Sequence, residues 1–264
     1  MHIKILDLFE NKARFIVYNI NAAFANGIRR SMISEVPKIA IEYLKIYNNT
    51  SILYDEQLGL RMTLVPLKMN QNYIEQSKCS CNYKGCPICE VSLRLDAKGP
   101  KVVYSGDIIS SDPNVMVTDK NIPLIKLKEG QVIMLEAFAH VGYGMNHVRW
   151  QVGIACGYKN MPIINISNCD GCGSCVPVCS KKIIEIINNK AFVSNENTIN
   201  CSLCKLCEKS CDLKDPAIKI SYDESTYIFT LESDGSYDSY ELILKASEII
   251  RGKVLQLKSK IENI

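Results

Sequence analysis

The 13 cysteines are the residues of this chain with the clearest capacity for chemistry. Eight lie between Cys169 and Cys211, four lie between Cys79 and Cys89, and Cys156 stands alone. The N-terminal residues alternate in polarity and carry early acidic side chains, unlike a signal peptide, so we expect a cytoplasmic chain. In a reducing compartment, clustered thiols are more often metal ligands than disulfides, although intracellular hyperthermophile proteins are an exception.

The eight downstream cysteines form an internal duplication of the pattern C-x2-C-x2-C-x3-C, with an offset of 32 residues. Bacterial-type ferredoxins have this spacing, and the fourth cysteine of each run ligates the other cluster. This crossing predicts two sets of iron–sulfur ligands. Cluster A takes Cys179, Cys201, Cys204 and Cys207, and cluster B takes Cys169, Cys172, Cys175 and Cys211.

Other uses of these thiols remain open. Zinc binds four thiolates but rarely in two interlocked quartets, and disulfides could replace one cluster. A c-type haem attachment or a Rieske centre would need a histidine, and none occurs between residues 169 and 211. Ser180 and Asp212 stand where ferredoxins usually have proline, which weakens the case for two intact clusters. We therefore predict one or two iron–sulfur clusters, of the 4Fe–4S or 3Fe–4S type.

The upstream group reads C-x-C-x4-C-x2-C, with Gly85 and Pro87 in the turn. Four thiolates this close in sequence can close a structural, tetrahedral zinc site. The predicted zinc ligands are Cys79, Cys81, Cys86 and Cys89. The alternatives are a pair of disulfides or free surface thiols. Cys156 lies in an apolar stretch and is expected to be a small buried residue.

Hydrophobic periodicity predicts the elements near the chain's start. Ile3–Phe9 and Ala13–Tyr18 alternate and predict a hairpin. Asn21 can cap a helix that stops before Pro37, and Lys38–Ile46 alternates as a strand. Residues 47–158 contain several short strand patterns broken by proline turns.

Further along, we expect a short helix at Lys182–Ile187 and strands at Ala191–Val193 and Tyr227–Glu232. Glu241–Ile261 predicts a long helix with apolar residues at intervals of three and four. Such a stripe can pack on the chain's own domain or on a partner helix. Its members are Leu242, Ala246, Ile250, Val254, Leu257 and Ile261.

Charge and motif content narrow the function. Lys plus Arg number 31 and Asp plus Glu 28, so the net charge of +3 argues against a generic nucleic-acid binder. No apolar run reaches the roughly 18 residues of a membrane span. Enzyme motifs are missing: Gly142–His147 begins like a dinucleotide loop but has histidine in place of the third glycine. His140 and His147 are expected to be structural.

Four blocks of sequence carry a family resemblance: Asn21–Arg30 with the following Pro37, Leu58–Leu67, His140–Trp150 and Leu231–Gly235. Their order, together with the ferredoxin-like cysteines and the four-cysteine loop, resembles the D-type family of α-like subunits in archaeal DNA-directed RNA polymerase. The likeness runs along essentially the whole chain. Val148-Arg149 departs from the Ala-Lys usual in the family.

The resemblance implies an α+β fold in three parts. An α-subunit-type dimerisation domain of strands plus long helices would comprise residues 1–47 and 219–264. A mostly-β domain, 48–162, would be inserted into it and carry the four-cysteine loop. A ferredoxin-like α+β domain, 163–218, would follow.

The resemblance also implies a non-catalytic scaffold. Family members form a heterodimer with a small α-like subunit, L, and this pair, with small subunits N and P, nucleates assembly of the large catalytic subunits. The implied contact residues are Asn26, Arg29, Arg30 and the helix stripe Leu242, Ala246, Ile250, Val254 and Leu257. We expect little or no direct nucleic-acid contact and no membrane contact. Two readings compete: a ferredoxin-like electron-transfer subunit of an oxidoreductase, and a free-standing zinc and iron–sulfur protein.

Overall fold

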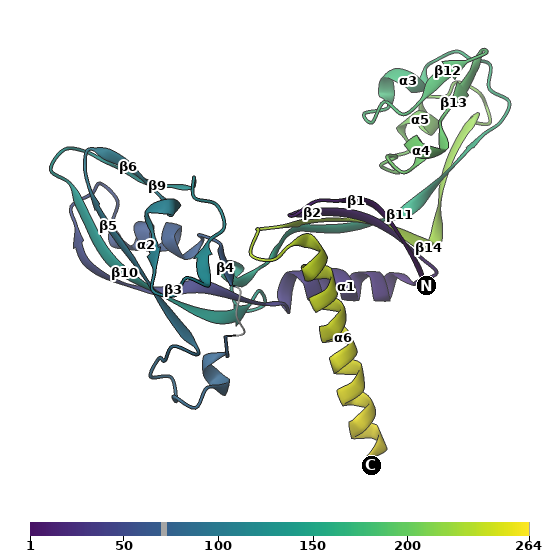
Figure 1. Ribbon diagram of the computed structural model, residues 1–264. Coiled ribbons are helices and arrows are strands. Elements are labelled where there is room, and N and C mark those ends of the chain that lie inside the picture. The colour runs from purple at the N-terminus through teal and green to yellow at the C-terminus, as the bar shows by residue number, and fades with distance from the viewer. Residues whose placement is uncertain (70–72, 264) are drawn as a thin grey trace. The chain divides into compact units, whose positions relative to one another are not determined.

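The computed structural model describes residues 1–69 and 73–263, in which strands predominate and a few helices connect them (Figure 1). The predicted α+β class is confirmed. The chain divides into two compact units, and the three-domain division remains a prediction. The first unit comprises Met1–Leu6, Arg14–Ala25 and Gly157–Phe229, and the second comprises Asp7–Ala13, Asn26–Cys156 and Thr230–Ile264.

Most of a four-stranded sheet, in the order β1-β2-β14-β11, lies in the first unit. Its strands are β1 (His2–Leu8), β2 (Lys12–Tyr18), β11 (Gly153–Ile166) and β14 (Ile218–Ser233). The predicted N-terminal hairpin is confirmed, and the expected strand at Tyr227–Glu232 is the end of the longer β14. Phe15 and Phe229 stack with their ring centroids 5.1 Å apart, so β2 and β14 share an aromatic core.

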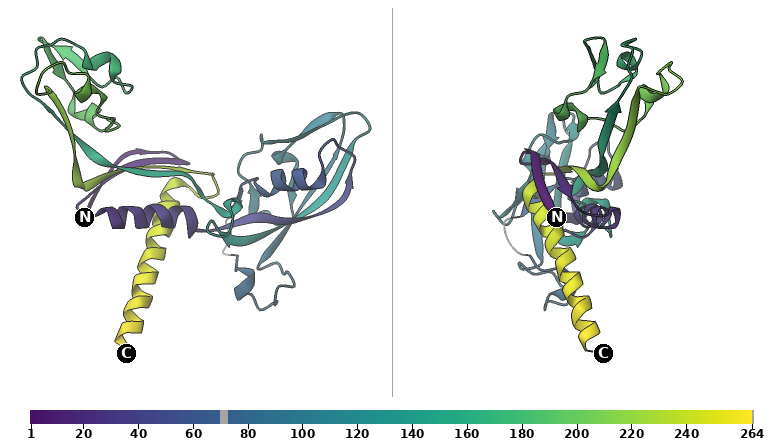
Figure 2. Two further views of the ribbon diagram at one scale, coloured as in Figure 1. Left: turned by 180° about the vertical axis from the view of Figure 1, so that it is seen from behind. Right: turned by 90° about the vertical axis from the view of Figure 1, so that its right-hand side faces the viewer.

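The cysteine-rich segment of the first unit contains only short elements, seen beside one another in both views of Figure 2. They are α3 (Cys175–Val178), β12 (Glu185–Ile187), β13 (Lys190–Phe192), α4 (Asn195–Thr198) and α5 (Leu206–Lys209). The expected helix at Lys182–Ile187 was wrong, because β12 pairs with β13 as a hairpin. Asn188 and Asn189 have φ of 51° and 55°, the left-handed pair that a tight type I′ turn requires.

The second unit is built on the four-stranded sheet β3-β10-β5-β7, with two small sheets beside it. The expected strand at Lys38–Ile46 is confirmed as part of β3. The main sheet comprises β3 (Pro37–Asn49), β10 (Val132–Tyr143), β5 (Glu90–Lys98) and β7 (Ile109–Ser110). The small sheets pair β4 (Leu67–Met69) with β8 (Val115–Val117), and β6 (Lys101–Tyr104) with β9 (Pro123–Leu127).

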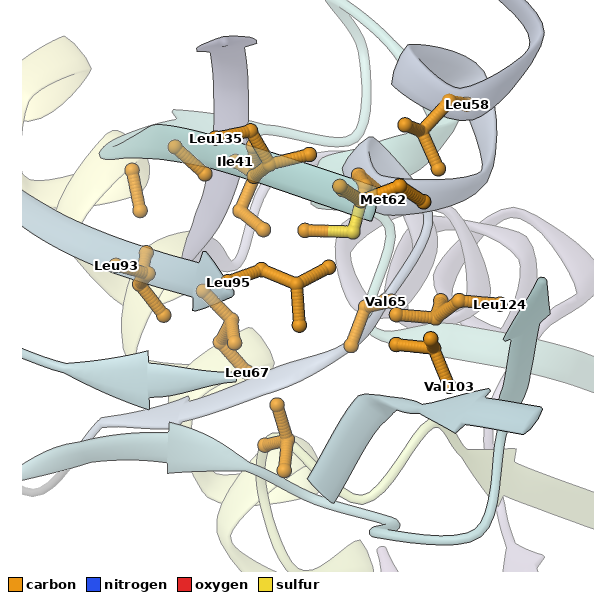
Figure 3. Close-up of a cluster of buried hydrophobic side chains, with 14 of the residues drawn as sticks. Ile41, Leu58, Met62, Val65, Leu67, Leu93, Leu95, Val103, Leu124 and Leu135 are labelled. Atoms are coloured by element: carbon orange, nitrogen blue, oxygen red, sulfur yellow. The ribbon is translucent and has the colours of Figure 1, made fainter. Parts of the chain in front are cut away.

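One apolar core fills the second unit. β5 alternates buried and more exposed positions, so that Leu93 and Leu95 face inwards. Figure 3 shows these side chains in one cluster with Leu58 and Met62 of α2 (Asp55–Thr63). All four are at most 1% exposed, and burying a side chain of this size stabilises the fold by about 1.5–3 kcal/mol.

The two longer helices are α1 (Ala22–Ser34) and α6 (Ser239–Glu262). The Asn21 side chain accepts the backbone N–H of Phe24 at 2.8 Å, so the predicted cap of α1 is confirmed. Within the second unit, the buried Ser31 hydroxyl of α1 donates to the Ala246 carbonyl of α6 at 3.2 Å. The other turns carry the 3-10 helices η1 (Gln76–Lys78), η2 (Ser105–Asp107) and η3 (Val148–Trp150).

Candidate metal centres and assembly surface

The four upstream cysteines converge between η1 and β5. The Cys79–Cys86 and Cys81–Cys89 Sγ distances are both 3.5 Å, and the Cys86–Cys89 distance is 3.6 Å. A tetrahedral zinc ion with Zn–S bonds of about 2.3 Å would set its sulfurs about 3.8 Å apart. The four sulfurs are therefore already spaced for one ion, and they are too far apart for a disulfide bond.

Tight turns hold this arrangement. The backbone N–H groups of Cys89 and Glu90 both donate to the Cys86 carbonyl, at 3.0 and 2.9 Å. Gly85 has φ of 76°, and a Cβ there would lie 2.6 Å from the Glu90 carboxylate, so a larger residue would be strained and would displace that carboxylate. The site is thus anchored directly to the first residue of β5.

The thiols differ in how readily they ionise. The backbone N–H of Ile88 lowers the pKa of Cys86 to about 7, whereas burial raises the pKa of Cys89 to about 12. Metals bind the thiolate form, so Cys86 is better prepared than Cys89 to act as a ligand, and a bound ion would compensate the charge of an ionised Cys89.

A buried histidine supports the same corner of β5. His140 is 3% exposed, and its Nε2 and Nδ1 atoms lie 2.8 Å from Glu90 Oε2 and 3.0 Å from Glu42 Oε2. Both ring nitrogens are occupied, so the side chain acts as a structural tie. His147 is exposed, and its Nδ1 accepts the backbone N–H of Arg149 at 3.2 Å.

The eight downstream cysteines surround two cavities of the first unit. The first is lined by Cys179, Cys201, Cys204 and Cys207 together with aliphatic side chains such as Ile164, Ile184 and Ile218. The second is lined by Cys169, Cys172, Cys175 and Cys211, and Cys207 borders both. This grouping matches the crossed one derived from the spacing, while the bound group remains a prediction.

The upstream sulfurs lie closer together than the downstream ones. In residues 1–69 and 73–263, the upstream quartet is the only group of at least three His, Cys, Asp or Glu side chains whose ligand atoms all lie within 4.8 Å of one another. The downstream thiols stand wider apart, as ligands of a cluster larger than one ion would. All 13 cysteines are free thiols, and purely thiolate donors suit zinc or iron–sulfur clusters.

Backbone N–H groups donate to several of the downstream thiols, and hydrogen bonding and burial change how readily two of them ionise. The N–H of Ala191 donates to Cys169 Sγ at 3.2 Å, and that of Ala217 donates to Cys211 Sγ at 3.4 Å. The backbone N–H of Leu206 lowers the pKa of Cys204, and burial raises the pKa of Cys207 to about 11. Such N–H···S contacts are among those that tune protein-bound clusters.

Two contacts to Cys201 and to the turn just before it were not foreseen from the sequence. Lys159 Nζ donates to the Cys201 carbonyl at 2.5 Å, and Arg14 Nη2 donates to the Ile199 carbonyl at 3.2 Å. No sequence signal marks Arg14, because it lies 185 residues from Ile199 along the chain.

The predicted interface residues divide by burial. On α6, Leu242 and Ala246 are 0% exposed and are therefore buried within this chain, and Ile250 is half-buried. Val254 and Leu257, in contrast, are 59% and 60% exposed. Figures 1 and 2 show the C-terminal half of α6 extending away from the rest of that unit.

The corresponding residues of α1 lie on its surface. Arg29 Nε and Nη2 donate to the Asn26 side-chain oxygen at 3.1 and 2.9 Å, whereas Arg30 is exposed. No described helix combines the length and apolar character that a membrane crossing requires.

Known proteins similar to this chain are polymerase subunits. Residues 45–154 match the RNA polymerase Rpb3/RpoA insert domain. A DNA-directed RNA polymerase subunit Rpo3 from Methanosarcina acetivorans is 48% identical over 100% of this chain and 99% of its own length. Proteins of the same name from Archaeoglobus fulgidus and Methanothermobacter thermautotrophicus are 40% and 39% identical, each over at least 97% of both chains.

Proposed function

Because this chain belongs to the family of DNA-directed RNA polymerase subunit Rpo3, we propose that it is a non-catalytic assembly subunit of that polymerase. The observation that carries the proposal is similarity to polymerase subunits from end to end. Nucleotidyl transfer then belongs to the large subunits of the complex. The competing reading, an electron-transfer subunit of an oxidoreductase, loses its support because the match is not confined to the cysteine-rich segment.

The first partner we propose is the small α-like subunit L, followed by subunits N and P and the large subunits. The exposed half of α6 supports this assignment, since Val254, Leu255, Leu257 and Ile261 are 55–61% exposed. An apolar surface of this kind is rarely left in water by a stable monomer. Asn26, Arg29 and Arg30 of α1 are proposed contacts to a large subunit, where the guanidinium fork can bind carboxylates or carbonyls. We expect little direct contact with nucleic acid.

Co-expression with the L subunit tests the heterodimer. We expect a soluble 1:1 complex in size-exclusion chromatography with light scattering, and a chain that aggregates when expressed alone. Val254→Glu combined with Leu257→Glu should abolish the complex, whereas the matched control Gln256→Glu, on the same exposed part of α6, should leave it intact. A soluble monomer that ignores L would overturn the dimerisation claim.

We further propose that Cys79, Cys81, Cys86 and Cys89 hold one zinc ion. Clusters A and B would hold one or two iron–sulfur clusters, of the 4Fe–4S or 3Fe–4S type. The sulfur spacing of the upstream loop and the two thiol-lined cavities support this division. When bound, each group would cross-link chain segments through metal–thiolate bonds.

Metal analysis of anaerobically purified protein tests these assignments. We expect four or more irons per chain with matching sulfide, plus one zinc. About three irons would indicate a single incomplete cluster. Zinc without any sulfide would remove the iron–sulfur assignment and leave the assembly role untouched.

A further inference from the structure

The two halves of the cysteine duplication have the same loop conformation but different residues in it. In the loop Cys169–Cys175, Gly171 and Gly173 have φ of 77° and 80°. The positions 32 residues later are Leu203 and Lys205, with φ of 59° and 58°. The loop Cys201–Cys207 therefore places two side-chain-bearing residues in the left-handed region that its counterpart gives to glycine.

This difference carries an energetic cost. A non-glycine residue in the left-handed region is less stable by about 1–2 kcal/mol, because its Cβ approaches the following carbonyl oxygen. Such conformations persist only where the surrounding structure fixes them. The loop Cys169–Cys175 needs little external help, whereas the loop Cys201–Cys207 requires contacts that hold it in shape.

Those contacts come from the sheet of the same unit. Lys159 on β11 donates to the Cys201 carbonyl at 2.5 Å. Arg14 on β2 reaches the preceding turn, where its Nη2 lies 3.2 Å from the Ile199 carbonyl and 3.0 Å from the Asn200 side-chain oxygen. Both cations are half-buried, and burial lowers the pKa of Lys159. Hydrogen bonds from charged donors are stronger than neutral ones.

The other loop has no such anchor among the described residues. There, the hydrogen bond that reaches Cys169 from outside its loop comes from a backbone N–H, that of Ala191. Within that loop, the Asp170 side chain accepts the N–H of Cys172 at 3.1 Å. Among the described residues, charged side chains from the sheet therefore contact the second half of the duplication, at Cys201 and the turn before it.

We propose that Arg14 and Lys159 are positioning residues for cluster A: Lys159 holds the strained loop Cys201–Cys207 at its first carbonyl and places a positive charge beside the cluster, and Arg14 holds the turn that leads into this loop. The proposal rests on the proposed iron–sulfur function. It makes retention of cluster A depend on the sheet β1-β2-β14-β11, while cluster B is held by its own glycine-containing loop.

The test uses the full chain in complex with L, reconstituted with iron and sulfide under anaerobic conditions. Lys159→Met and Arg14→Gln should each speed the release of iron from cluster A to a chelator by at least about tenfold, which is the effect of losing one charged hydrogen bond. The release of iron from cluster B should be unchanged. Lys159→Arg should restore the slow rate, and Lys4→Met, an exposed lysine on the same sheet, should have no effect.

A purely structural role would not move the reduction potential of the cluster. A nearby positive charge favours the more negative, reduced form, so Lys159→Met should lower the potential of cluster A relative to wild type. Lys159→Arg should keep it. This is measured by a redox titration followed by electron paramagnetic resonance.

A double variant addresses the strain directly. Lys205→Gly removes a left-handed penalty at an exposed position, whereas Leu203 also packs against the buried residues of this segment, so adding Lys205→Gly to Lys159→Met should recover part of the lost cluster retention. Unchanged release rates and potentials in both Lys159→Met and Arg14→Gln would overturn the proposal. If Lys159→Met does not fold, the iron-release rates of Arg14→Gln, alone and combined with Lys205→Gly, test the proposal instead. A wild-type chain that binds no iron and sulfide would instead reject the iron–sulfur function itself.

Discussion

The loop Cys79–Cys89 and the segment Cys169–Cys211 use the same donor atoms in two different ways. The first sets four sulfurs 3.5–3.6 Å apart along its shortest contacts and lies directly against β5 of a large apolar core. The second spreads eight thiols around two cavities, and a fourth cysteine from each repeat reaches the cavity of the other.

The difference shows how cysteine spacing is matched to what surrounds it. A loop attached to a formed core can close on a single ion without being needed for the core itself. The downstream segment has short helices, a two-stranded hairpin and a small cluster of buried residues, so the proposed metal cross-links would supply much of its stability. Small domains often require such metal staples.

The largest effect is expected from removing cluster A. Replacing Cys201, Cys204 and Cys207 together with serine should unfold the downstream segment, because cluster binding is coupled to folding. We expect a low yield of complete polymerase, with the assembled fraction elongating RNA at close to the normal rate. Zinc content should remain one per chain.

Cys156→Ser is the matched control, since Cys156 lies outside all three quartets and should leave both metal content and assembly unchanged. A mutant polymerase that assembles fully but elongates slowly would contradict this prediction. It would point instead to direct control of catalysis by the cluster.

The reciprocal change should have a smaller effect. Replacing Cys79 and Cys86 with serine should remove zinc, keep iron and sulfide, and open residues 73–89 to proteolysis. The core of the second unit should survive, because its buried aliphatic side chains come from the sheets and α2 rather than from this loop. Unfolding of the whole chain on zinc loss would show that the loop is a folding staple as well.

Much of the architecture could be predicted because it depends on local patterns. Asn21 and Pro37 bound α1, and the alternation of Ile3–Phe9 and Ala13–Tyr18 specifies the hairpin. The two cysteine spacings likewise identified the candidate sites before any geometry was known. The match to Rpo3 subunits confirms the family suggested by the blocks around α1 and β10.

Other features depend on contacts that sequence alone does not reveal. The helix expected at Lys182–Ile187 ignored the Asn188-Asn189 pair, whose tolerance of left-handed φ marks a hairpin turn. Burial of Leu242 and Ala246 inside the chain requires knowing what packs on α6. The contact of Arg14 with the turn before Cys201 joins residues too distant in sequence for any local pattern to record.

A third prediction concerns the support of the upstream loop. His140→Gln cannot keep both carboxylate contacts of the ring, so it should lose the contact to Glu90 or the contact to Glu42. We expect a loss of about 1–3 kcal/mol in the free energy of unfolding, measured by urea titration. Tyr43→Phe is the control, because it removes one hydroxyl contact to the same Glu90 at 3.1 Å and should cost less. If both substitutions left the free energy of unfolding almost unchanged, the upstream loop would not depend on the contacts of His140 with Glu90 and Glu42.

The smallest effect is expected from Asn189→Gly in the β12–β13 hairpin. Its φ of 55° is more easily adopted by glycine, and Asn-Gly is a preferred type I′ pair, so the turn should gain less than about 1 kcal/mol. A gain of this size should raise the midpoint of thermal unfolding slightly in the metal-loaded chain. In metal-free protein it should leave the segment 163–218 unprotected in amide hydrogen exchange, because turn stability cannot replace the proposed metal–thiolate bonds. Protection of that segment without iron, in this variant or in wild type, would mean that it folds on its short elements alone and that the contrast with the zinc-like loop is wrong.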